Sequence, residues 1–370
     1  MPNLPIFKII DLNAIPQTKE YQPLSQEVYS TISEYLEQNK KIIIFINKKG
    51  LARSIVCQDC GYIFNCSLCD IPLVFHKENN QSLLRCHHCG STHEAPTICP
   101  QCQGHKLKLL GIGTERVLED IKKHFPSSLV ALIEGPMEDD KEKQIMQQFQ
   151  EGHLNILIGT TALLRPQIET TDLTIVPTVD TFLSLPDYQS EEKIFFNLWQ
   201  LKNITQDKMI IQTMIPKHKI FNFLQDQLVF PFLQEENSWR QQLLWPPYVQ
   251  LIKLTYSHKN ITQAQKATEQ LKKLLALQIK QKIPTSLQDN FIISGPAPAF
   301  IFKEKNKYHY HLFIKFRYFE SSPPLLPADF NLPLTTLAPL PTQNELNQRN
   351  KILQIIPPSW KIEVDPKNIL

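Results

Sequence analysis

The sequence predicts an α/β domain with a mainly parallel sheet, interrupted by a cysteine-rich module and followed by a small α+β domain. Three observations support this prediction. Short apolar runs alternate with amphipathic segments up to about Trp245, all 8 cysteines lie between Cys57 and Cys102, and strand-like runs surround one long amphipathic segment beyond Trp245. A chain of 370 residues with a hydrophobic fraction of 42% is long enough for several domains with their own cores.

Alternating strands and helices define the first domain. Its first helix is expected from Leu24 to Lys40, where Val28, Ile32 and Leu36 recur every fourth residue. The other expected helices are Glu115–Phe125, Asp139–Gln150 and Glu191–Leu201, and the expected strands are Ile42–Ile46, Leu107–Leu110, Leu129–Ile133, Asn155–Ile158, Leu173–Val179 and Met209–Gln212. Such alternation indicates a mainly parallel sheet covered on both faces. Residues 1–23 show no clear period, and we expect a lead-in linker there.

A boundary is expected at Trp245-Pro246-Pro247, where the pattern changes. Beyond it, a long helix from Ile261 to Gln278, capped by Asn260, is expected among four strands. These strands are Leu251–Tyr256, Phe291–Ser294, Tyr308–Phe316 and Trp360–Val364. The expected domains are therefore residues 24–56 with 103–245, the cysteine module at 57–102, and an α+β domain at 246–370.

The cysteines form four Cys-x-x-Cys pairs, a spacing that lets two thiolates grip one tetrahedral metal ion. The pairs are Cys57 with Cys60, Cys66 with Cys69, Cys86 with Cys89, and Cys99 with Cys102. Four pairs in one stretch predict two structural zinc ions, each held by four thiolates, with no open position for catalysis. Spacing alone leaves two arrangements open: nested, joining outer with outer and inner with inner pairs, or sequential, joining the first two and the last two.

The sequence predicts that this module lies in a reducing compartment. The start of the chain lacks the features of a signal peptide, and its longest compact apolar run, Ile42–Ile46, is far shorter than the roughly 20 residues of a membrane helix. We therefore expect a cytoplasmic protein without a membrane partner, in which paired cysteines indicate metal rather than disulfides. The formal charge of +3 is too small to indicate nucleic-acid binding, so any such affinity would come from local patches.

Several short segments occur in the order in which one family carries them. They are Ile43–Gly50, Cys57-Gln-Asp-Cys60-Gly61, Arg85–Gly90, Gly111–Glu115, Ile156–Thr160, Trp245–Pro247, Gly295–Pro298 and Val364–Pro366. From about Pro23 to the end, the chain resembles the C-terminal half of PriA, the primosomal protein N′, a family of superfamily-2 helicases of replication restart.

The resemblance implies a RecA-like second helicase lobe carrying the inserted double-zinc module. It also implies nested zinc pairing: Cys57, Cys60, Cys99 and Cys102 around one ion, and Cys66, Cys69, Cys86 and Cys89 around the other. The implied partners are branched or single-stranded DNA, single-strand binding protein, and the primosome factors that load the replicative helicase. The implied location is the nucleoid.

The motor motifs depart from the family. The chain contains no G-x-x-x-x-G-K-[ST] loop, and the arginine-rich stretch that the family carries after about Leu198 is absent between Trp199 and Lys208. After Gly159-Thr160, Ala162 to Gln167 replace a Lys-Gly pair and an acidic segment. Phosphoryl transfer needs a phosphate cradle, a held magnesium and usually an arginine. We therefore expect neither ATP nor magnesium as a cofactor, and no ATPase or helicase activity from this chain alone.

A basic and aromatic segment is the candidate DNA contact. Lys303, Lys305 and Lys307 could neutralise phosphates, and Tyr308 or Tyr310 could stack on an unpaired base. The alternative is a basic hairpin turn before a half-buried strand. The function predicted overall is replication restart through binding of forked DNA and recruitment of partners. The alternatives are the second subunit of a split ATP-dependent helicase, and a zinc-ribbon adaptor that binds only protein.

Overall fold

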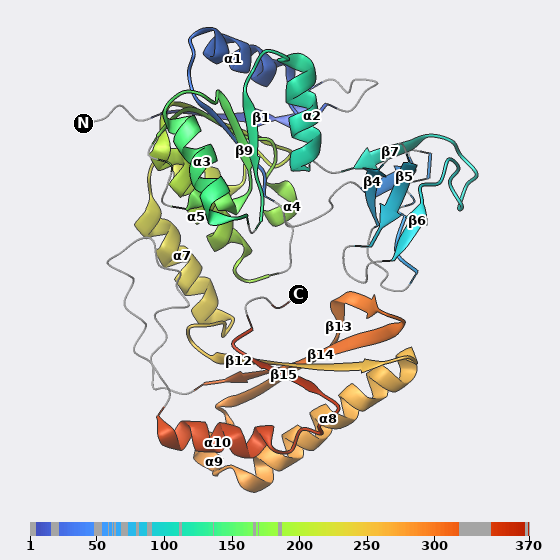
Figure 1. The fold of residues 1–370 in the computed structure, drawn as a ribbon. Helices are drawn as coiled ribbons and strands as arrows, with labels where there is room; N and C mark the ends of the chain where they lie inside the picture. The colour runs from blue at the N-terminus through green and yellow to red at the C-terminus, as the bar shows by residue number, and fades with distance from the viewer. Residues whose placement is uncertain are drawn as a thin grey trace. The chain divides into compact units, whose positions relative to one another are not determined.

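The computed structural model places most of the chain in two compact units (Figure 1). It describes residues 5–15, 22–47, 54–57, 59–60, 62, 64–67, 73–78, 81–86, 91–110, 113–135, 137–165, 168, 170–183, 187–317, 342–366 and 369. The first unit comprises Met1–Ser54, Lys108–Leu185 and Ser190–Leu228, and the second comprises Ile55–Leu107, Pro186–Gln189 and Val229–Leu370.

The first unit contains a six-stranded sheet in the order β1-β11-β10-β2-β9-β8, in which every pairing is parallel. The strands are β1 (Ile6–Asp11), β2 (Ile42–Phe45), β8 (Val130–Ile133), β9 (Ile156–Gly159), β10 (Thr171–Val176) and β11 (Thr205–Thr213). The central strand β2 is fully buried, as its run of isoleucines predicts. The predicted α/β class with a parallel sheet is confirmed.

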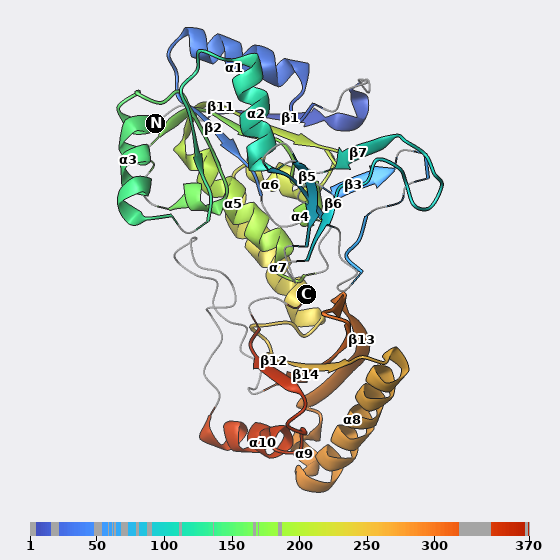
Figure 2. The same ribbon diagram turned by 45° about the vertical axis from the view of Figure 1, so that its right-hand side comes forward.

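Helices cover both faces of this sheet (Figure 2). They are α1 (Gln26–Glu37), α2 (Thr114–His124), α3 (Asp139–Gln150), α4 (Asp180–Leu183), α5 (Ser190–Ile204) and α6 (Lys219–Gln225), with short 3-10 turns at η1 (Leu12–Ala14) and η2 (Thr161–Leu164). Val28 and Ile32 of α1 and Val117 of α2 pack against Ile42 and Ile44 of β2. On the opposite face α5 contacts β10 and β11. Alternate residues of each strand therefore face different helices, which is the arrangement of a RecA-like lobe.

One expectation for the first unit is wrong. Residues 1–23 were expected to be a lead-in, but Ile6–Asp11 forms the edge strand β1 and pairs in register with Lys208–Thr213 of β11. Its sequence, Ile-Phe-Lys-Ile-Ile-Asp, does not alternate apolar with polar residues and Ile6 is 63% exposed, so no period of two marks the strand in the sequence. The partner strand lies about two hundred residues away, and only that pairing reveals β1.

The cysteine module contains short strands in two small sheets. β3 (Ser54–Cys57) pairs with β7 (Leu107–Leu110), and β4 (Val74–Glu78), β5 (Gln81–Arg85) and β6 (Thr92–Glu94) form an antiparallel sheet. Strands β3 and β7 lie at the two ends of the module, and β3 ends at Cys57, the first residue of the first cysteine pair.

The C-terminal part of the second unit is an antiparallel sheet in the order β13-β14-β12-β15. Its elements are α7 (Val229–Gln242), β12 (Gln250–His258), α8 (Ile261–Lys282), α9 (Thr285–Gln288), β13 (Phe291–Glu304), β14 (Lys307–Phe316), α10 (Gln343–Leu353) and β15 (Lys361–Val364). Leu271 and Leu275 of α8 pack with Leu254, Leu312 and Ile314 of the sheet. The predicted α+β class is confirmed, although α7 and α10 were not expected from the sequence.

The opposite face of this sheet buries polar groups. Thr255 lies opposite His311 in the pairing of β12 with β14, and the Thr255 Oγ1 is 3.0 Å from the His311 Nδ1. Burial, together with the nearby charges of Lys253, His309 and Lys361, lowers the pKa of His311 to about 3, and burial is the largest of these causes. The imidazole is therefore neutral in the folded domain down to strongly acidic pH.

This histidine should make the stability of the C-terminal domain depend on pH. Unfolded His311 takes up a proton below about pH 6.5, whereas folded His311 does so only near its lowered pKa of about 3. As the pH is lowered from about 6.5 toward 3, the free energy of unfolding should therefore fall by about 1.4 kcal/mol for each pH unit. His311→Asn should flatten this dependence, measured as hydrogen exchange in β12 and β14. His153→Asn, at a side chain that is 71% exposed, is the control. Equal slopes for wild type and His311→Asn would contradict the assignment.

Candidate functional site

Four cysteine sulfurs converge in the second unit. The Sγ atoms of Cys57, Cys60, Cys99 and Cys102 all lie within 4.8 Å of one another. Cys57 is 3.5 Å from Cys102, and Cys60 is 3.6 Å from Cys99. A tetrahedral zinc ion with Zn–S bonds of about 2.3 Å sets its sulfurs about 3.8 Å apart. These four side chains therefore fit one zinc ion, and the structure brings together the two outer cysteine pairs.

The same backbone closure shapes both loops of this site. The Cys57 N–H donates to the carbonyl of Tyr62, and the Cys99 N–H donates to that of Gly104, each over 2.9 Å. In both loops the first cysteine thus bonds to the residue five positions later. This closure turns the two thiols of a Cys-x-x-Cys pair toward one point, as a metal knuckle requires.

The inner cysteines repeat part of this pattern. The Cys86 N–H donates to the Ser91 carbonyl over 2.8 Å, again across five positions, and the Ser91 hydroxyl lies 3.3 Å from the Cys66 Sγ. Cys66 and Cys86 are both buried. Cys69 and Cys89 lie outside the described residues. The Cys86 loop therefore has the closure of the two loops that form the first site.

The electrostatics of the first site favour a bound cation. Burial raises the pKa of the Cys99 thiol, but hydrogen bonds from the Cys102 and Gln101 N–H groups outweigh burial and bring it to about 7. The Gly104 N–H lowers the pKa of Cys102, whereas hydrogen bonds with Cys60 and Cys57 raise it to about 12. Crowded thiols cannot all ionise without a positive charge among them, and a divalent metal supplies it.

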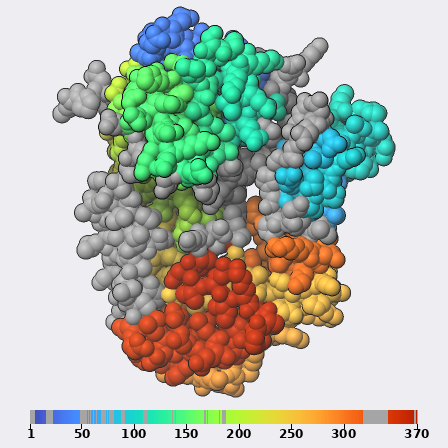
Figure 3. All heavy atoms as spheres, viewed as in Figure 1, coloured from blue at the N-terminus to red at the C-terminus, as the bar shows by residue number. Residues whose placement is uncertain are grey.

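The residues of the candidate DNA contact lie on one hairpin, at the surface of the second unit (Figure 3). β13 and β14 are joined by a tight turn in which Lys305 and Asn306 have φ of 46° and 63°. Lys305 and Lys307 are exposed at this turn. Lys303 is more constrained, because its Nζ donates to the Ser67 carbonyl over 2.9 Å and lies 5.6 Å from the centre of the Tyr308 ring.

The two tyrosines of this hairpin pack inward. The Phe302 ring centre is 5.4 Å from that of Tyr308 and 5.6 Å from that of Tyr310. Tyr310 is only 7% exposed, so its ring offers no open face to a ligand. Phe300, which the sequence analysis did not consider, is 58% exposed on β13, the strand that also carries Phe302.

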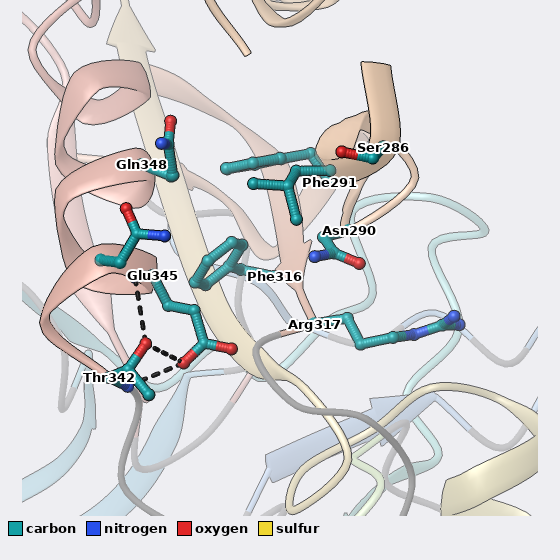
Figure 4. A pocket seen from close by; sticks show the side chains of 10 residues that line it. Ser286, Asn290, Phe291, Phe316, Arg317, Thr342, Glu345 and Gln348 are labelled. Atoms are coloured by element: carbon teal, nitrogen blue, oxygen red, sulfur yellow. Dashed lines mark hydrogen bonds between the residues drawn. The ribbon is translucent and has the colours of Figure 1, made fainter. Parts of the chain in front are cut away.

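A cavity of about 540 Å³ lies elsewhere in the C-terminal domain (Figure 4). Its lining combines the rings of Phe291 and Phe316 with polar groups that include Arg317, Glu345 and Gln348. Glu345 accepts hydrogen bonds from the backbone N–H and the hydroxyl of Thr342 in the capping box of α10. Because that carboxylate already caps a helix, the cavity does not resemble an acid–base catalytic site.

Comparison with known proteins agrees with this arrangement. Residues 66–93 match the model of the PriA DNA helicase Cys-rich region (CRR) domain, and residues 241–367 match that of the Primosomal protein N C-terminal domain. Both models describe PriA proteins, so the chain is similar to the PriA family in its cysteine-rich region and in its C-terminal domain. The PriA cysteine-rich region and the convergent sulfurs together support zinc binding by this chain.

Curated PriA relatives are similar over most of the chain. "Replication restart protein PriA" of Synechocystis sp. is 29% identical over 324 residues, covering 85% of this chain and 38% of the relative. The Bacillus subtilis protein of the same name is 27% identical over 323 residues, covering 85% and 39%, and that of Borreliella burgdorferi is 27% identical over 311 residues, covering 82% and 46%. The chain thus spans less than half the length of each of these PriA relatives.

Residues of the first unit at or near the departures from the PriA motor motifs make structural contacts. Arg165 forms an ion pair with Glu142, whose side chain is only 3% exposed. Helix α5 runs to Ile204 and β11 begins at Thr205, so no loop separates them. Asp180 accepts hydrogen bonds from the Thr213 hydroxyl and the Met214 N–H. Lys48 lies outside the described residues. Across the part of the chain that the structure describes, no helix has the length and apolarity to cross a membrane.

Proposed function

We propose that this chain acts in replication restart by binding branched or single-stranded DNA at stalled forks and recruiting primosome partners. The observation that carries the proposal is the combination of a converging cysteine cluster with a C-terminal domain that matches the PriA model over residues 241–367. By family resemblance, its protein partners are single-strand binding protein and the factors that load the replicative helicase, and it works at the nucleoid.

The division of labour follows the expected domains. Residues 24–56 and 103–245, together with the edge strand β1, form a degenerate second helicase lobe, residues 57–102 hold two zinc ions, and residues 246–370 contact DNA. Cys57, Cys60, Cys99 and Cys102 hold the first ion, and Cys66, Cys69, Cys86 and Cys89 hold the second. The contacts of Arg165 and the direct passage from α5 into β11 support a chain without ATPase activity of its own.

The basic turn of the β13–β14 hairpin supplies the phosphate contacts in this proposal. Lys305 and Lys307 are exposed. Among the residues that the structure describes, the one ion pair of Lys305 joins its Nζ to the Glu304 Oε1 over 4.0 Å. A surface pair at that distance contributes little, so the Lys305 charge remains available to a phosphate. Exposed lysines on a stiff hairpin bind the nucleic-acid backbone by displacing its counterions.

Reversing these two charges should weaken DNA binding. Lys305→Glu together with Lys307→Glu should reduce the affinity for a forked DNA about tenfold or more. The slope of log K against log salt concentration should become shallower by about 1.4, because two phosphate contacts with a single strand are lost. Fluorescence anisotropy across a salt series measures both quantities. The control is Lys266→Glu with Lys273→Glu, which makes the same charge change at exposed positions of α8.

The outcomes separate the candidates. Loss of binding in the hairpin variant but not in the α8 variant supports the proposed function. Equal losses in both would mean that net charge alone drives binding, and no binding by the wild-type chain would favour an adaptor that binds only protein.

A further inference from the structure

Phe300 is an exposed aromatic side chain on a distorted strand. The pairing of β13 with β14 shifts register between Pro298 and Lys303, so the residues between them depart from regular alternation. Ala299 is 7% exposed, whereas Phe300 beside it is 58% exposed. A bulge of this kind redirects a side chain out of the sheet pattern. Burying a phenylalanine is ordinarily favourable, so this exposure lacks a packing explanation within the domain.

The other rings of the hairpin are already occupied. Tyr308 and Tyr310 pack on Phe302, and the Lys303 ammonium covers the Tyr308 ring. These contacts stiffen the strand that carries Phe300. Phe300 is therefore the aromatic side chain of this hairpin with the most accessible ring, and it lies on a strand that the neighbouring ring contacts stabilise.

Positive charge lies close to this ring along the strand. Lys303 is three residues beyond Phe300, no more than about 11 Å along the chain, and Lys305 and Lys307 follow at the turn. That separation is comparable to one or two nucleotide steps of a single strand. A ring beside a row of cations is the arrangement by which proteins hold single-stranded nucleic acid, with stacking on bases and ion pairs on phosphates.

We infer that Phe300 stacks on an unpaired base of single-stranded DNA while Lys305 and Lys307 contact the phosphates beside that base. The inference rests on the proposed function and names the residue that distinguishes unpaired from paired DNA. Duplex DNA offers no open base face, so Phe300 contributes to binding only where a strand is unpaired. A protein partner fits this surface less well, because docking normally uses a contiguous apolar patch rather than one ring beside lysines.

Stacking has a spectroscopic signature that a structural role lacks. The probe is an oligothymidylate with a single 2-aminopurine, whose fluorescence changes when the base stacks on a ring. Phe300→Leu should weaken binding about tenfold, because one base loses its aromatic stacking partner, and should abolish the fluorescence change. Phe300→Trp should restore both. Because the charge is unaltered, the salt dependence should remain that of wild type.

A matched control isolates the position. Phe230→Leu removes another exposed phenylalanine, 46% exposed on α7, and should leave binding and fluorescence unchanged. Wild-type affinity and fluorescence in Phe300→Leu would overturn the inference, while loss of binding in the Lys305→Glu, Lys307→Glu variant would still support the proposed function. Loss of duplex and single-strand binding alike in Phe300→Leu would also overturn it. Failure of the wild-type chain to bind the oligonucleotide would reject both.

Discussion

Replacing Cys57 and Cys99 together by alanine should remove one zinc ion from the chain and leave the other bound. The Sγ atoms of these two cysteines belong to one cluster within 4.8 Å, so either single change already opens that tetrahedron and the second change costs no further metal. Zinc per chain, measured by mass spectrometry of the purified protein under reducing conditions, should fall from two to one in Cys57→Ala, in Cys99→Ala and in the double variant.

A second double variant completes the design. Cys57→Ala with Cys66→Ala should remove both ions if the pairs are nested, but only one if the first two pairs share an ion. Conversely, sequential pairing would make Cys57→Ala with Cys99→Ala lose both ions. Fewer than two zinc ions in the wild-type protein would contradict the proposed second site.

Metal loss should also unfold the module. Structural zinc contributes about 10–16 kcal/mol to the folding of zinc-finger peptides, which is as large as the whole stability of many domains. Hydrogen exchange of peptides covering β3 and residues 96–105 should rise sharply in Cys57→Ala. Peptides covering β9 and β10 in the first unit should be unchanged, because their sheet does not contain the cluster.

Gly159→Ala should destabilise the first unit by about 3 kcal/mol, since overpacking a dense core commonly costs 1–3 kcal/mol and occasionally more. A Cβ at Gly159 would lie 2.5 Å from the Ile133 carbonyl oxygen and 2.8 Å from the Leu163 Cγ. The first of these neighbours is backbone in the adjacent strand β8, so it cannot move without disturbing the β8–β9 pairing. Hydrogen exchange in β8 and β9 measures the loss.

Gly152→Ala provides the comparison. It adds the same methyl group in the same unit, where no atom lies within 4 Å, but at a φ of +79°. The cost there should be only about 1 kcal/mol, from the left-handed backbone. Equal destabilisation by the two changes would show that the close approach to β8 does not decide the effect at Gly159.

The sequence was most informative where local pattern sets local structure. The cysteine spacing predicted a metal module, and the isoleucine run of β2 predicted a fully buried strand. Helix α3 begins and ends at the predicted residues. These features depend on spacing within a few residues, so one sequence suffices to reveal them.

Features that depend on distant partners were less accessible. Edge strand β1 has no clear period in the sequence, and its pairing with β11, some two hundred residues away, is what reveals it. The strand expected to end at Ser294 continues to Glu304, because a register shift carries β13 past Gly295 and Pro296. A second register shift, between Pro298 and Lys303, contains Phe300, which precedes the basic and aromatic segment from which Tyr308 and Tyr310 were chosen.

The pairing of β1 with β11 has a consequence for synthesis. The ribosome releases Ile6–Asp11 first, but its partner Lys208–Thr213 emerges only after some two hundred further residues. At elongation rates of about 5–20 residues per second, the first strand waits on the order of ten seconds or more for its partner. The cysteine pairs from Cys57 to Cys102 leave the ribosome within that interval, so the nascent chain can load metal before its largest sheet is complete.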